Sequence, residues 1–136
     1  MSRPSPDSNR PTGLAPGVPY AYAAVTRDRP LLVFTAGACP LDSAGATVAP
    51  GDVASQAEAG MANLGAALES AGARLEDVVK ITVYVASRER SDLDDAWNAV
   101  HRCFGSHEPP ATLLGVSVLG YTDQLVEVEA VAALQH

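Results

Sequence analysis

The sequence predicts an α+β fold in which two helices cover one face of a mostly antiparallel sheet. Two segments, residues 52–71 and 91–105, carry apolar residues every three or four positions, which is the spacing of one helix face. Shorter segments around them alternate apolar and polar residues or form brief apolar runs, as strands do. The predicted order of elements is ββαβαββ, and two helices can cover only one face of such a sheet.

The chain has 136 residues, enough for one domain with its own hydrophobic core. Residues 1–16 contain four prolines among mostly polar and small residues and are predicted to form a disordered arm. Residues 17–136 are predicted to form a single folded domain. Its first two strands are residues 20–26 and 31–36, and a turn that ends in proline lies between them, so we expect them to pair as a hairpin.

Both helices have recognisable ends. Asp52 can cap the first helix, which runs to about Ala71, and Gly72 is placed to end it. A second amphipathic helix is predicted from Ser91 to Gly105. The apolar stripe of the first helix consists of Val53, Ala57, Met61, Leu64, Leu68 and Ala71.

Three more strands are predicted. Residues 78–86 alternate between two faces, and residues 112–119 and 125–134 are expected to pair as a second hairpin around the loop 120–123. The core face of the strand at 78–86 is predicted to consist of Val79, Ile81, Val83 and Val85.

The sheet face away from the helices is predicted to mix apolar side chains with Lys80, Glu127 and Glu129. This mixture is too apolar for water and too polar for a dry core, so we predict a subunit interface with clefts. Glu127 and Glu129 project from the same face of the last strand and are candidate acid–base carboxylates. A solvated or interfacial strand face is the simpler alternative.

Composition disfavours several classes of function. Nine basic residues stand against sixteen acidic ones, and a net charge of −7 repels phosphate backbones and anionic membranes, so no nucleic-acid or membrane partner is predicted. No apolar run could span a bilayer and no signal segment is recognised, which predicts a cytoplasmic protein. Cys39 and Cys103 are interpreted as buried thiols in a reducing compartment, with a structural disulfide as the alternative. No metal-ligand spacing or nucleotide-binding loop appears, so neither a metal nor a cofactor is predicted.

Motifs spread along the chain after the arm give a more specific indication. They are Phe34-Thr-Ala-Gly37, Pro40-Leu-Asp42, Gly51-Asp52, Asn63-Leu64, Asp77-Val-Val-Lys-Ile-Thr-Val-Tyr84, Trp97-Asn98, Pro110-Ala111 and Val126-Glu-Val-Glu-Ala130. In this order and combination they make residues 20–134 resemble the Rid/YjgF family of reactive imine and enamine deaminases. The resemblance implies a chorismate-mutase-like subunit and a homotrimer, a trimeric barrel with three clefts between subunits.

The resemblance also implies a site in the cleft. Family members place a glutamate at the position of Glu127, where it is thought to position the attacking water. The family's Pro-Ala-Arg segment, whose guanidinium holds the substrate carboxylate, reads Pro110-Ala111-Thr112 here, and no gap separates it from the Glu-x-Glu-Ala motif. The other substrate-binding positions that the resemblance implies are Tyr20, Ala36, Gly37, Asn98 and Leu114.

The presence of Thr112 bears on the substrate. Losing the partner of a desolvated carboxylate costs roughly 3–5 kcal/mol, and no motif places Arg88, Arg90 or Arg102 in the cleft. We therefore expect a Rid-type hydrolase that deaminates an imine or enamine other than a simple 2-imino acid, with Glu127 as general base and Thr112 orienting the ligand. The alternative is a non-catalytic trimer that binds small molecules or regulates. The net charge disfavours an endoribonuclease.

Overall fold

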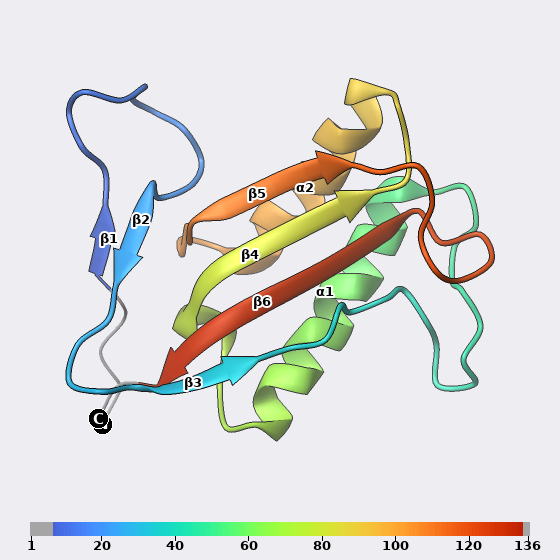
Figure 1. Ribbon diagram of the computed structural model, residues 1–136. Coiled ribbons are helices and arrows are strands. Elements are labelled where there is room, and N and C mark those ends of the chain that lie inside the picture. Colours follow the sequence, from blue (N-terminus) through green and yellow to red (C-terminus); the bar gives the residue numbers. More distant parts are fainter. Residues whose placement is uncertain (1–6, 135–136) are drawn as a thin grey trace.

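The computed structural model describes residues 7–134, and its main body is a four-stranded sheet with two helices on one face (Figure 1). Helices α1 (Val53–Ser70) and α2 (Arg90–Phe104) share one hydrophobic core with the sheet, which confirms the predicted α+β class and the one-sided helix layer. The strands lie in the order β3-β6-β4-β5. Their bounds are Leu31–Phe34 for β3, Val78–Val85 for β4, Ala111–Gly115 for β5 and Val126–Leu134 for β6.

Strand β6 lies inside the sheet and is antiparallel to both β3 and β4. Strand β5 is parallel to β4, because α2 carries the chain back to the start of the sheet between them. The predicted hairpin of the last two strands is therefore wrong. After β5 the chain crosses β4 and forms β6 on the far side of β4 from β5. In this position the long strand β6 pairs with both β3 and β4, whereas next to β5 it would lie at the edge of the sheet with a single partner.

The other predicted hairpin is also wrong. Strand β2 (Ala23–Val25) pairs with β1 (Asp7–Asn9) in a separate two-stranded sheet, and β3 pairs with β6 instead. Figure 1 shows this small sheet beside the main one. A turn signal marks where the chain reverses, but it does not decide which strands share hydrogen bonds.

The arm predicted at residues 1–16 lies partly outside the described residues. Where the structure describes it, the chain forms β1 and a loop, and the disorder of the arm stays a prediction. Arg10 joins this segment to the body, because its guanidinium donates to the carbonyls of Val18 and Tyr20 and pairs with Glu108 at 2.8 Å. These polar contacts join the segment to the rest of the chain, and composition does not reveal them.

The ends of α1 follow the prediction. The Asp52 carboxylate accepts from the Ser55 amide at 3.0 Å, and Gly72 adopts the left-handed backbone that ends the helix. Ala71 lies beyond the helix and is exposed, whereas the rest of the predicted stripe is buried. Helix α2 begins at Arg90, one residue before the predicted start.

The core face of β4 differs from the prediction at one end. A register shift between Val78 and Lys80 turns Val78 into the core in place of Val79. From Ile81 onward the expected alternation holds, and Lys80 and Tyr84 face away from the helices. No helix in residues 7–134 is long and apolar enough to cross a membrane.

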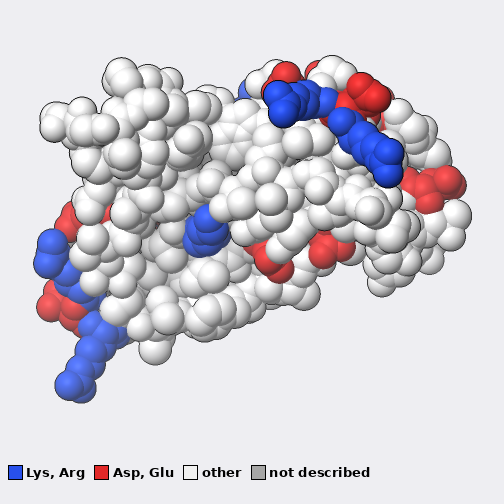
Figure 2. Space-filling model, turned by 45° about the horizontal axis from the view of Figure 1, so that its top comes forward, with Lys and Arg blue, Asp and Glu red and all other residues white. Residues whose placement is uncertain are grey.

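The sheet face away from the helices, called the open face below, is largely uncharged at its edges. Phe34 is 71% exposed and Leu114 is 44% exposed, although both are large apolar side chains on strands. Figure 2 shows a mostly uncharged surface on which the charged groups form small separate clusters.

Candidate functional site

Glu127 lies on the open face of β6, between the buried residues Val126 and Val128. Its carboxylate accepts two hydrogen bonds at the same oxygen. The Gln124 amide donates to Oε1 at 3.1 Å, and the Cys39 thiol lies 3.3 Å from the same atom. Glu127 is thus held by a loop on one side and by the chain beyond β3 on the other.

Gly37 adjoins this carboxylate because the chain after β3 continues beside β6. Ala38 exchanges two backbone hydrogen bonds with Val128, at 2.6 and 3.1 Å, and these hold the segment in place. A Cβ added at Gly37 would overlap the Glu127 carboxylate. A glycine at this position therefore permits the close approach of this segment to the Glu127 carboxylate.

Glu129 has a different environment from Glu127. The Tyr84 hydroxyl donates to its Oε1 at 2.5 Å. This hydrogen bond, together with partial burial and the charges of both glutamates, raises the pKa of Tyr84 above its usual value. The two carboxylates that look alike in sequence are therefore distinct, since one is held by Tyr84 and the other adjoins Gly37.

Thr112, at the position that the resemblance gives to arginine, lies beside a lysine. The Lys80 ammonium nitrogen is 2.6 Å from the Thr112 hydroxyl oxygen. The parallel register of β4 and β5 pairs Thr82 with Thr112. Lys80 is two residues before Thr82 and therefore lies on the same face of β4. Sequence reasoning missed this contact because it weighed only arginines. Of those, Arg102 instead pairs with Glu58 on α1 at 3.4 Å.

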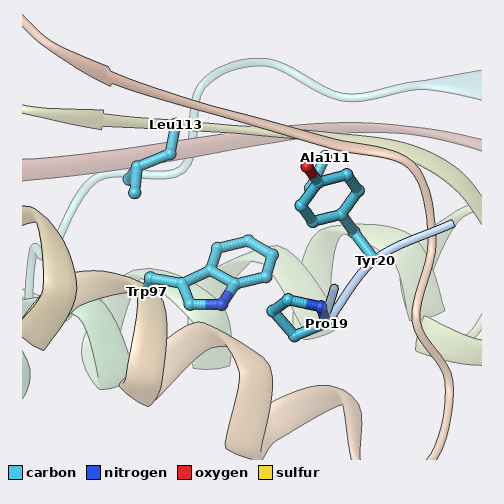
Figure 3. Close-up of a pocket in the computed structure, with 5 residues that line it drawn as sticks. All are labelled: Pro19, Tyr20, Trp97, Ala111 and Leu113. Carbon is cyan, nitrogen blue, oxygen red and sulfur yellow. The ribbon is translucent and has the colours of Figure 1, made fainter. Parts of the chain in front are cut away.

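Tyr20 lines a separate pocket on the helix side of β5. Figure 3 shows its ring facing the pocket above Trp97 of α2, with Ala111 and Leu113 of β5 nearby. The pocket has a volume of about 370 Å³ and is lined mainly by apolar and aromatic surface. Asn98 follows Trp97 and is exposed.

One chain does not bring all the predicted positions together. Tyr20 lies against β5, whereas Glu127 and Gly37 lie at β6, and β4 separates those two strands. Ala36 is exposed next to Gly37, and Leu114 is partly exposed on β5. The predicted positions thus form two groups in the monomer, one at each side of β4.

The cysteines differ from the prediction. Cys103 is exposed on α2, although a buried thiol was expected. Cys39 is half-buried, and burial together with the neighbouring Glu127 raises the pKa of its thiol to about 11. Its contact with Glu127 was not foreseen, since the two residues are 88 positions apart.

Within residues 7–134, no three side chains of histidine, cysteine, aspartate or glutamate are grouped as a metal site.

Comparisons with known proteins agree with this architecture. The family model described as "Endoribonuclease L-PSP" matches residues 11–134. A RutC family protein from Pyrococcus abyssi is 36% identical over 114 residues, which cover 84% of this chain and 85% of the relative. A protein from Salmonella typhimurium named 2-iminobutanoate/2-iminopropanoate deaminase is 31% identical over 97% of this chain and 98% of its own length.

A solved structure supports the same assignment. A conserved Rid family protein of unknown function from Yersinia pestis superimposes with a TM-score of 0.86 and 25% identity, covering 96% of this chain and 99% of the other. Because the family model and the relatives match nearly the whole described chain, the protein belongs to the Rid/YjgF family.

Proposed function

We propose that the protein hydrolyses an imine or enamine and releases ammonia. The observation that carries this proposal is the carboxylate of Glu127, which two donors hold at one oxygen and which packs directly against Gly37. The Salmonella relative is named for an imine deaminase, and it matches along 97% of this chain. Together these support general-base chemistry on water in this family member.

The proposed reaction needs only water. Glu127 takes a proton from water while the oxygen adds to the C=N carbon, and it then gives this proton to the imine nitrogen to form a carbinolamine. The hydroxyl proton next passes through Glu127 to the nitrogen as the C–N bond breaks, so ammonia leaves and the carbon becomes a carbonyl. An enamine reaches the same route after a proton is added to its carbon and the imine forms.

The proposed site lies between subunits of a homotrimer. In the monomer, Tyr20 lies on one side of β4, and Glu127 and Gly37 lie on the other. The exposed apolar side chains Phe34 and Leu114 on the open face would be covered by a second copy. Contact of one copy's β5 side with another copy's β6 side would complete the cleft.

The proposed substrate differs from a simple 2-imino acid. Thr112 has one hydroxyl in place of a guanidinium fork, and the Lys80 ammonium beside it supplies a single point charge. Without the bidentate contact, we expect a neutral substrate or one whose anionic group lies elsewhere.

The predicted cytoplasmic location stays a prediction.

Ammonia release tests the proposed function. The purified protein is mixed with imines and enamines generated in place, in pairs with and without a carboxylate, and ammonia is measured against the uncatalysed rate. Acceleration of any member supports the proposal. If the protein binds these compounds but accelerates the hydrolysis of none, the proposed function is wrong and the protein is a non-catalytic small-molecule-binding protein.

A further inference from the structure

The Gln124 side chain is buried and held in one orientation. It is 4% exposed, its amide nitrogen donates to the Val126 carbonyl and to Glu127 Oε1, both at 3.1 Å, and its oxygen accepts from the Tyr121 amide at 3.0 Å. A rotated amide would place its NH₂ group against the Tyr121 N–H and its oxygen against two acceptors. The Glu127 carboxylate therefore always meets a donor from this side.

A second buried amide anchors the loop that carries Gln124. Gln56 of α1 is fully buried, and its oxygen accepts from the Leu125 amide at 2.7 Å. Its nitrogen donates to the carbonyls of Asp123 at 2.9 Å and Ala49 at 3.3 Å. The loop is thus tied to the helix layer directly on both sides of Gln124, which limits its motion relative to β6.

Cys39 reaches Glu127 from the opposite side. Asn63 of α1 donates to the carbonyls of Cys39 and Leu41, at 2.8 and 3.0 Å, and so fixes this part of the chain. The thiol then lies 3.3 Å from Oε1, the oxygen that Gln124 also contacts. The raised pKa of Cys39 keeps its thiol protonated at neutral pH, so the sulfur acts as a donor there.

We propose that Gln124 and Cys39 are positioning residues that hold Oε1 of Glu127 and leave Oε2, beside Gly37, to accept the proton of the attacking water. This inference rests on the proposed function. Two donors on one oxygen fix the plane of the carboxylate, and Oε2 occupies the space that a Cβ at Gly37 would fill, so the glycine lets the carboxylate adopt this orientation. Orientation of this kind matters because small displacements of a catalytic group reduce rates strongly.

The first arm of the test measures the hydrogen bond itself. In a Cys103→Ser background, the rate of Cys39 alkylation by iodoacetamide is followed against pH. We expect an apparent thiol pKa near 11 for the parent. Glu127→Gln should lower this value because the carboxylate raises it, and Gln124→Met should raise it because the amide lowers it. An unchanged alkylation profile in both variants would overturn the arrangement, whether or not the protein is an enzyme.

The second arm measures turnover on the best substrate found. Gln124→Met removes the donor at similar volume, and we expect kcat to fall by about tenfold to a hundredfold with little change in KM. Cys39→Ser keeps a donor and should retain more activity than Cys39→Ala. Wild-type kcat in both Gln124→Met and Cys39→Ala would overturn the positioning role. If Gln124→Met does not fold, the Cys39 pair still decides.

Discussion

The ammonium nitrogen of Lys80 lies 2.6 Å from the hydroxyl oxygen of Thr112, across the parallel pair of β4 and β5. Lys80 is the chain's single lysine, and it lies beside Thr112, the position at which the resemblance implies arginine. The cation beside Thr112 therefore comes from the neighbouring strand β4, and an ammonium does not offer the parallel donors of a guanidinium. Substrate preference should follow from that difference.

Thr112→Arg should increase turnover of 2-iminobutanoate, which the wild type should deaminate slowly. We expect a gain in kcat/KM of about tenfold to a hundredfold, below the full effect of ~3–5 kcal/mol, because the Lys80 ammonium repels a second cation. Ammonia release measures the gain, and Thr112→Met is the matched control. A wild type as fast as the Salmonella deaminase would contradict this account of the cleft.

Lys80→Met should discriminate between substrates by charge. Loss of the ammonium should lower kcat/KM for carboxylate-bearing imines and leave neutral imines nearly unaffected. The ratio of the two rates is the measurement, since it is insensitive to a general loss of folded protein. An equal loss on both substrates would indicate a structural role for Lys80.

Glu127→Gln and Glu129→Gln form a matched pair. The first should reduce turnover by about 10²- to 10⁴-fold, as expected when a general base is removed. The second should retain most turnover and change thermal stability or assembly, because Glu129 is held by Tyr84. Equal activity in Glu127→Gln would remove this residue from the mechanism.

Tyr84 gives a pH readout of its contact with Glu129. Its pKa is raised mainly by the hydrogen bond to Glu129, so the phenol should ionise later than an ordinary tyrosine. A raised pKa in the folded state means that this contribution to stability is present below pH 10 and is lost as the pH rises through the folded value. Ultraviolet titration, with Tyr84→Phe to identify the signal, should show an earlier ionisation in Glu129→Gln.

Gly37→Ala should impair activity strongly. The new Cβ would overlap the Glu127 carboxylate and force it to move. Gly65→Ala is the control, because its Cβ would meet open space on α1 and should stabilise the helix by up to ~1 kcal/mol. Thermal unfolding and ammonia release distinguish the two effects. A fully active Gly37→Ala would place the reaction away from this glycine.

Assembly is tested by light scattering at micromolar concentration. We expect a mass of about three times 14 kDa. Phe34→Glu, which introduces a charge on the exposed apolar face, should shift the mass towards the monomer. A monomeric wild type would contradict the proposed site between subunits.

Local sequence signals predicted the helices well because their causes are local. Asp52, Gly72 and the apolar stripe of α1 act within a few turns of one helix. The strand partners could not be predicted, since β5 and β6 each read as hairpin strands and only the complete sheet decides their neighbours. The contacts of Cys39 with Glu127 and of Lys80 with Thr112 depend on that strand order, which explains why residue types alone did not indicate them.

The position of β6 between β3 and β4 has a consequence for how the protein can change over evolutionary time. A strand paired on both sides should show the slowest amide exchange, so Glu127 is carried by one of the most rigid parts of the molecule. Thr112 lies on the edge strand β5, and Tyr20 lies on a segment outside the main sheet. Under the proposed mechanism, mutations at these peripheral positions would alter which compound is accepted while Glu127 keeps its position, so substrate range would diverge with the reaction unchanged.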